Sequence, residues 1–128
     1  MDSTSLVEPA IEDGRALLAA LDAKGVKITA AYWFFLSEPN EWRLILATPL
    51  VDSKGPRDAY QQIQQILQSQ LPNGKLSLDL ISVVSPNNPQ VRALSSALTT
   101  GPGITGIRFS RNTVNGIFIE DAYIYRLS

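Results

Sequence analysis

The sequence predicts a single α+β domain, with α/β as the alternative, built on a five-stranded mixed sheet with three helices in the order αββαβαββ. A chain of 128 residues fits one domain and can bury a core without a disulfide or a structural metal. With 45% apolar and 18% charged residues, the composition excludes disordered and coiled-coil classes. Segments with helical periodicity alternate with segments that repeat every second residue. We therefore expect one globular domain over residues 1–128, with 1–8 as a flexible N-terminal segment.

The first helix is expected from Pro9 to Lys24, because apolar residues recur there every three or four positions and Pro9 suits a first turn. Gly25 follows, where a left-handed residue commonly ends a helix. Gly14 lies within the apolar stripe. We favour an ordinary amphipathic helix at this position, and the alternative is a close approach of the helix to the sheet.

Two strands are expected next, at residues 26–37 and 42–51. The four residues between them, Glu-Pro-Asn-Glu, have turn chemistry and predict an antiparallel hairpin. The first strand becomes apolar on both faces toward its end, which predicts cover on both sides. Pro49 lacks a backbone donor and places the end of the second strand at a sheet rim or a bulge.

The clearest helix follows, over residues 56–70, with Pro56 in its first turn and Asp52 and Ser53 as its expected caps. A third strand is expected at 75–85. A short helix should then occupy 89–99, with Asn88 as its cap.

The last two strands are expected at 104–111 and 117–127. Asn115-Gly116 between them is a strong signal for a tight hairpin. The helices at 56–70 and 89–99 are both long enough to be right-handed crossovers between parallel strands.

The absence of His and Cys restricts the chemistry that this chain can perform. It excludes a His general base, a thiol nucleophile, disulfides, and the usual ligands of zinc, iron–sulfur clusters and haem. A formal net charge of −1 predicts no electrostatic attraction to nucleic acid or anionic lipid. We expect no cofactor and no metal site.

Residues 101–106, Gly-Pro-Gly-Ile-Thr-Gly, match the G-x-G-x-x-G pattern of dinucleotide-binding loops. That pattern requires a strand before the glycines and a helix after them, so that the helix N-terminus meets a pyrophosphate. Here the expected order is reversed, and Pro102 removes one amide donor. We therefore interpret the glycines as a helix stop and a strand entry.

A charged loop, from Asp52 to Asp58, carries the alternative hypotheses about chemistry. Capping by the two acids is the favoured interpretation. Lys54 and Arg57 could instead bind an anion beside a helix N-terminus. A metal-dependent phosphoesterase or nuclease using Asp52 and Lys54 is the second hypothesis, and it needs further carboxylates. The available ones are Asp79, which we expect on a solvated face, and Glu120 and Asp121, which should point to opposite faces of a strand unless a bulge intervenes.

Basic and aromatic residues alternate on the terminal hairpin, a pattern that can bind single-stranded nucleic acid. They are Arg108, Arg111, Tyr123, Tyr125 and Arg126. However, residues 65–128 hold five basic and three acidic residues, a net charge of only +2. We favour a solvated sheet face with cross-strand Arg–Tyr contacts, and nucleic acid is the lowest-ranked partner.

Glutamines cover the outer face of the helix at 56–70 with no charge between Asp58 and Lys75. They are Gln61, Gln62, Gln64, Gln65, Gln68 and Gln70. Charge is depleted at the centres of protein interfaces, so this face is a candidate contact surface, although a solvated helix face is slightly favoured. Trp33, Phe35 and Trp42 are candidate anchors for the same purpose, although a two-sided core is the favoured interpretation of these aromatics.

The sequence thus predicts a non-enzymatic binding protein, a small subunit or adaptor that acts through protein–protein contacts and could form a homodimer. The residues assigned to partner binding are Gln61, Gln65, Gln68, Trp33, Phe35 and Trp42, and the possible anion-binding pair is Lys54 and Arg57. We expect a cytoplasmic protein without membrane contact. The longest apolar run, from Ile28 to Leu36, is far shorter than the roughly 20 residues of a membrane-spanning helix.

Overall fold

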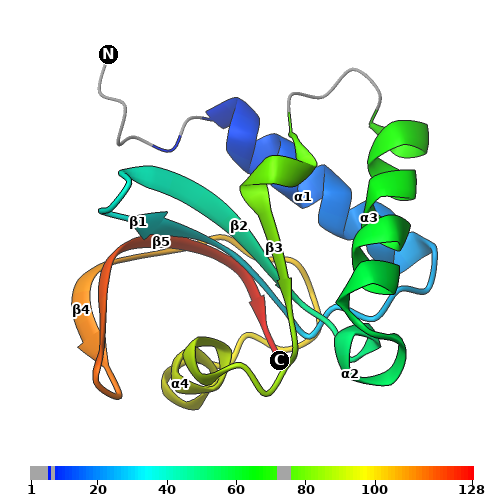
Figure 1. Cartoon of the computed structure of the whole chain (residues 1–128). Coiled ribbons are helices and arrows are strands. Elements are labelled where there is room, and N and C mark those ends of the chain that lie inside the picture. Colours follow the sequence, from blue (N-terminus) through cyan, green and yellow to red (C-terminus); the bar gives the residue numbers. More distant parts are fainter. Residues whose placement is uncertain (1–5, 7, 72–75) are drawn as a thin grey trace.

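A computed structural model describes residues 6, 8–71 and 76–128 as a single small domain with a five-stranded mixed sheet, which confirms the predicted fold class (Figure 1). The helices are α1 (Glu8–Ala23), α2 (Leu50–Lys54), α3 (Pro56–Gln70) and α4 (Pro89–Ala97), with a 3-10 turn η1 (Leu78–Leu80). The strands are β1 (Ala30–Leu36), β2 (Glu41–Ala47), β3 (Ile81–Val84), β4 (Ile107–Val114) and β5 (Ile117–Leu127).

The strands lie in the order β3-β2-β1-β5-β4. β1 and β2 form the predicted antiparallel hairpin, β4 and β5 form the second, and β5 also pairs antiparallel with β1. The crossover through α2 and α3 makes β2 and β3 parallel, as predicted. The expected parallel pair across residues 89–99 is wrong, because β3 and β4 are opposite edges of the sheet. The 11-residue β5 pairs with the free edge of β1, and β4 pairs with the other edge of β5, so that β4 lies far from β3 in the sheet.

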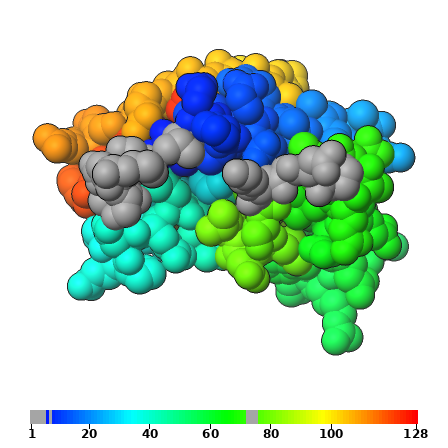
Figure 2. Space-filling view, turned by 90° about the horizontal axis from the view of Figure 1, so that it is seen from above, coloured from blue at the N-terminus to red at the C-terminus, as the bar shows by residue number. Residues whose placement is uncertain are grey.

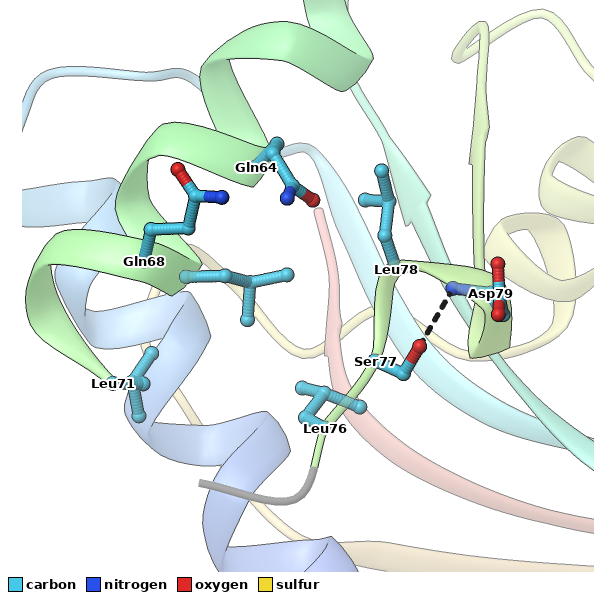
Figure 3. Close-up of a pocket in the computed structure, with 8 residues that line it drawn as sticks. Gln64, Gln68, Leu71, Leu76, Ser77, Leu78 and Asp79 are labelled. Atoms are coloured by element: carbon cyan, nitrogen blue, oxygen red, sulfur yellow. Dashed lines mark hydrogen bonds between the residues drawn. The ribbon is translucent and has the colours of Figure 1, made fainter. Parts of the chain in front are cut away.

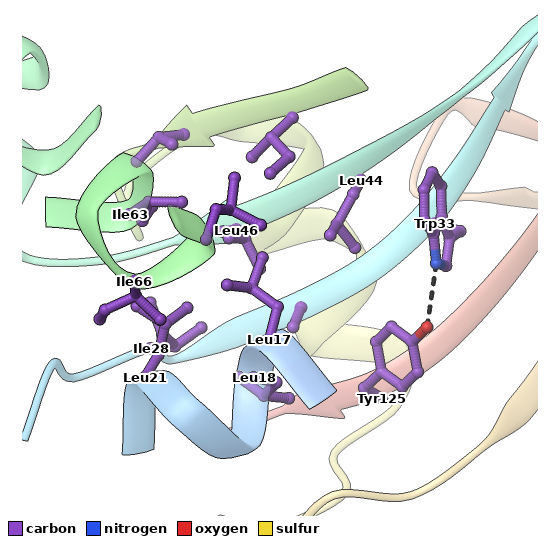
Figure 4. Packing of buried hydrophobic residues seen from close by; sticks show 14 of the residues in the cluster. Leu17, Leu18, Leu21, Ile28, Trp33, Leu44, Leu46, Ile63, Ile66 and Tyr125 are labelled. Carbon is purple, nitrogen blue, oxygen red and sulfur yellow. Dashed lines mark hydrogen bonds between the residues drawn. The ribbon is translucent and has the colours of Figure 1, made fainter. Parts of the chain in front are cut away.

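Two cores sandwich the sheet, and β1 is buried on both sides as its composition predicts. α1 and α3 cover one face, where the first core includes Leu17 of α1, Ile63 of α3 and Leu46 of the sheet, with Trp33 and Tyr125 at its other end (Figure 4). α4 lies against the opposite face (Figure 1), and the second core is formed there by residues such as Tyr32, Phe34, Val91, Leu94 and Ile124.

The N-terminal segment was expected to be flexible up to residue 8. Residues 1–5 and 7 lie outside the described residues. Leu6, however, packs against the first core, and Glu8 already begins α1. Gly25, just beyond α1, has a φ of 78°, the left-handed value predicted for a helix stop.

α1 approaches the sheet closely at Gly14, so the favoured interpretation of an ordinary amphipathic helix is incomplete. A Cβ atom at Gly14 would collide with the hydroxyl of Tyr125. That hydroxyl accepts a hydrogen bond from Trp33 Nε1 (2.9 Å) and donates one to the carbonyl of Ile11 (2.7 Å). The glycine therefore makes room for a buried link between α1, β1 and β5.

The capping predictions had opposite outcomes. Asn88 Oδ1 accepts hydrogen bonds from the backbone of Gln90 and Val91, which confirms it as the cap of α4. The predicted caps of α3 are wrong. Asp52 and Ser53 belong to α2, a helix that was not predicted. The N-cap of α3 is Gly55, directly before Pro56, and no side chain caps the helix.

The third strand is shorter than expected because its first half forms η1. The hydroxyl of Ser77 accepts a hydrogen bond from the backbone of Asp79 (3.2 Å), and the backbone N–H of Leu80 donates to the carbonyl of Ser77 (3.0 Å). The chain therefore turns before it joins β2 at Ile81.

Candidate protein-binding surface

The outer surface of α3 is uncharged and rich in glutamine, as predicted. The inward positions Ala59, Ile63, Ile66 and Leu67 are buried in the domain. Gln61, Gln65, Gln68 and Gln70 are exposed, and Gln62 and Gln64 are partly exposed. Between residues 59 and 71 the helix carries no charged side chain.

Two hollows flank this surface. One, of about 510 Å³, lies between α3 and the segment that precedes β3, and is lined by Gln64, Leu67, Gln68, Leu71, Leu76, Ser77, Leu78 and Asp79 (Figure 3). The other, of about 520 Å³, is lined by Arg57, Tyr60, Gln61, Gln64, Gln65 and Leu78. Because Gln64 and Leu78 line both, the two hollows are adjacent, and we call them together the α3 groove.

In the space-filling view, α3 (green) lies beside the segment that leads into β3 (yellow-green), with α1 (blue) next to them (Figure 2). The hydroxyl of Tyr60 accepts a hydrogen bond from the backbone of Val83 (3.0 Å), which ties α3 to the edge of β3. The two walls of the α3 groove are therefore joined directly. Leu71, Leu76 and Leu78 are only partly buried and supply apolar surface to it.

Among the described residues that line the α3 groove, two are charged, one in each hollow. Arg57 lines the first-turn end, and Asp79 lines the hollow on the far side of Leu78. Within the described part of the chain, neither side chain forms an ion pair. Asp58, the neighbour of Arg57, instead accepts a hydrogen bond from Gln62 (3.0 Å). Arg57 and Asp79 are therefore, among the described residues, charges that no opposite charge of the domain neutralises.

The three aromatic residues predicted as anchors lie in the first core. Trp33, Phe35 and Trp42 are 1%, 4% and 8% exposed. The rings of Phe35 and Trp42 are 5.3 Å apart, and the guanidinium of Arg108 lies 5.6 Å from the centre of the Trp42 ring. The favoured interpretation, a two-sided core, describes them, so the surface of α3 is left as the candidate contact site.

One exposed aromatic was missed. Phe118 in β5 is 59% exposed, and it is the single large hydrophobic side chain that is exposed among the described residues. It directly follows Ile117 and the Asn-Gly turn. The sequence did contain a signal for this exposure. Three consecutive apolar residues, 117–119, follow the predicted hairpin turn, and because side chains of a strand alternate between faces, one of them must point to the solvent side.

The charged loop contributes exposed charges without a converging carboxylate cluster. Lys54 and Arg57 are both exposed, and Asp52 accepts a hydrogen bond from the hydroxyl of Ser85 (2.9 Å). Asp79 is exposed, as expected. In residues 6, 8–71 and 76–128, no group of three or more acidic residues is placed to hold a metal ion.

Glu120 and Asp121 do not point to opposite faces of β5. Both line a hollow of about 430 Å³, together with Phe35, Ser110 and Arg111. The cause is a break in the strand alternation: Ile119 and Ala122, three residues apart, both belong to the second core, and Arg111 opposite them has a φ of 50°.

Asp121 is held by the neighbouring strand. It accepts two hydrogen bonds from Arg108 (2.8 and 2.7 Å) and one from Ser110 (2.9 Å). The hydrogen bonds from Arg108 hold the pKa of Asp121 below its ordinary value, and they outweigh the opposing effect of partial burial. This carboxylate is therefore engaged within the domain.

The basic and aromatic residues of the terminal hairpin do not share one solvated face. Arg126 is 4% exposed, and it binds Asp22 of α1 (2.7 Å) and the carbonyl of Ile28 (3.0 Å). Tyr125 is also buried, and burial raises its pKa. The expected solvated face therefore holds for Arg108 and Arg111 and is wrong for these two residues.

The glycine motif at 101–106 is a connection, as interpreted. α4 precedes it and β4 begins at Ile107, so no helix N-terminus follows the glycines. Gly101 has a φ of 84°, and a Cβ at Gly106 would collide with the hydroxyl of Tyr123. These glycines serve a backbone turn and a close approach to β5.

Among the described residues, no helix is long and apolar enough to cross a membrane. Comparisons with protein-family models, with curated proteins and with solved structures found no match for this chain.

Proposed function

We propose that this chain is a small binding subunit or adaptor that acts through protein–protein contact at the α3 groove. The observation that carries the proposal is that the two adjacent hollows of the groove combine partly exposed leucines with a rim of uncharged amides. The centre of a protein interface loses its water, and each buried unpaired charge there costs several kcal/mol. A surface with its charges at two separate points meets this requirement better than the charged loop before it.

The glutamine amides also suit recognition. Each carries two N–H donors and a carbonyl acceptor, so it can satisfy a polar group of either kind on a partner. The leucines beneath them offer apolar area that a partner side chain can cover, at about 25 cal/mol for each Å² removed from water.

A photo-crosslinking amino acid at Gln65 tests the proposal, with the same amino acid at Asn112 on the exposed edge of β4 as the control. In the native cells, we expect a covalent adduct with another polypeptide from position 65 and none from position 112. Excess wild-type protein without the crosslinker, present during irradiation, should suppress formation of the adduct, whereas the Gln61→Glu/Gln65→Glu variant should not. No adduct at position 65, or suppression by both competitors, would contradict the proposal.

A further inference from the structure

We infer that the partner at the α3 groove is the α3 groove of a second copy of this chain, related to the first by a two-fold axis that passes near Leu78. The inference rests on the proposed function and adds the identity of the partner. It follows from the arrangement of charge, amide and apolar groups in the groove.

The two charges of the groove are self-complementary. Arg57 lines one hollow and Asp79 lines the other, and Leu78 lies between them because it lines both. A two-fold axis between Arg57 and Asp79 exchanges their positions in the partner. Each Arg57 then lies beside the partner's Asp79, and the pair repeats on the other side of the axis. An interface between identical subunits requires this reciprocity, in which one residue contacts a second and the second contacts the first.

The uncharged part of the groove is self-complementary as well. A glutamine amide can donate to and accept from another glutamine amide, so a face of amides satisfies its own copy without a new side-chain chemistry. Leu78 near the axis meets its symmetry mate, and Leu71 and Leu76 extend this apolar strip. α3 has 15 residues and is about 22 Å long, enough for four turns of contact.

Charge reversal tests the inference. Sedimentation equilibrium of the full chain over 1–200 µM should show a wild-type dimer. Arg57→Asp leaves two acids facing two acids, and Asp79→Arg leaves two cations facing two cations. Each single variant should weaken the dimer at least tenfold in Kd. An equimolar mixture of the two variants should form a heterodimer with near wild-type affinity, because both ion pairs are then present: the native pair of Asp79 with Arg57, and a reversed pair between the substituted Asp at position 57 and the substituted Arg at position 79.

Lys54→Asp and Glu38→Arg are the matched controls, since they make the same charge changes at exposed positions outside the groove. Both should dimerise like the wild type, and circular dichroism should show that all variants are folded. A monomer at 200 µM, single variants that dimerise normally, or a mixture without heterodimer would each overturn the inference. If the chain is monomeric while position 65 still crosslinks to a different polypeptide, and excess wild-type protein suppresses that crosslink, the proposed function stands and the second copy is rejected. If neither is seen, both fail.

Discussion

At the scale of single residues, glycine and tyrosine set how closely α1 approaches the sheet. Because Gly14 has no side chain, the hydroxyl of Tyr125 fits against α1. This hydroxyl of β5 accepts a hydrogen bond from Trp33 of β1 and donates one to the carbonyl of Ile11 in α1. In an exposed helix, Gly→Ala stabilises by up to about 1 kcal/mol. Here the added methyl group must displace the buried ring of Tyr125, whose hydroxyl both accepts and donates a hydrogen bond.

We therefore expect Gly14→Ala to lower the free energy of unfolding by roughly 1–3 kcal/mol, the usual cost of overpacking a core. Urea unfolding measures it. Gly103→Ala is the control, since a Cβ there meets no atom within 4 Å, and it should change stability by less than about 0.5 kcal/mol. The combination Gly14→Ala/Tyr125→Phe should cost less than the sum of the two changes. Additive costs would show that the hydroxyl is not what the methyl group meets.

Asp121 makes stability dependent on acid pH. Its pKa is lowered in the folded protein by Arg108, while the unfolded chain has an ordinary carboxyl with a pKa of about 3.8. The unfolded state therefore binds more protons between the two values, and stability rises with pH there. The contribution is complete above the unfolded pKa and is lost as pH falls through the folded one.

In a series of urea unfolding experiments from pH 2 to 6, we expect Asp121→Asn to flatten the acid side of the stability curve. The variant and the wild type should converge at the lowest pH, where both side chains are uncharged. Glu38→Gln, in an exposed turn, should leave the slope unchanged. An unaltered slope in the Asp121 variant would place the pH dependence elsewhere.

At the scale of elements, local signals predicted helices and turns well where they depend on neighbours in the sequence. The Asn115-Gly116 hairpin and the Asn88 cap follow from backbone preferences of those residues, and both are present. Asp52 and Ser53 failed as caps because residues 50–54 form a helix of their own, and Gly55 turns the chain into α3 with a φ of 92°.

Strand faces were less predictable, because β5 departs twice from simple alternation. Glu120 and Asp121 line one hollow together. The register between β1 and β5 also shifts at Ala31 and Tyr32, where Tyr125 is the extra residue. A bulge changes which side chains share a face. The sequence of β5 contains no glycine or proline that would have indicated an irregular strand.

The cap of α4 yields a prediction at this scale. Asn88→Ala removes the acceptor for two backbone N–H groups and should destabilise the protein by about 1 kcal/mol. Ser53→Ala is the matched control, since its hydroxyl caps no helix, and we expect less than about 0.3 kcal/mol there. Thermal or urea unfolding of both variants checks the difference. Equal effects would contradict the assignment of Asn88 as the cap.

At the scale of the whole molecule, the candidate site arises where the crossover of α2 and α3 brings the chain back beside β3. The glutamine face of α3 could be predicted from the sequence, because helical periodicity and side-chain polarity are properties of neighbouring residues. The groove was not, since it needs Leu76 and Leu78 from a segment whose strand pattern hid a 3-10 turn. The cover over the three aromatics was not visible in the sequence either, because it comes from residues distant in the chain, such as Arg108 beside Trp42.

The bulge of β5 at Tyr125 has a consequence for the whole fold. Arg126 follows the extra residue and reaches three segments: Asp22 at the end of α1, the carbonyl of Ile28 before β1, and the carbonyl of Gly103 after α4. It is almost fully buried, whereas the Asp22 side chain is 39% exposed. The guanidinium therefore satisfies two carbonyls and one partly solvated carboxylate.

Removing Arg126 should therefore loosen all three segments together. We expect Arg126→Ala to lower the free energy of unfolding by roughly 2–3 kcal/mol, because two carbonyls lose a charged donor and a buried side chain is truncated. Asp22→Asn should cost less, about 1 kcal/mol, since water reaches that carboxylate and keeps its net contribution small. Arg92→Ala, on the exposed side of α4, should stay within about 0.5 kcal/mol. Urea unfolding at one fixed protein concentration measures all three, because any association at the α3 groove makes apparent stability depend on concentration. An Arg126 variant as stable as the Arg92 variant would show that these contacts do not hold the segments together.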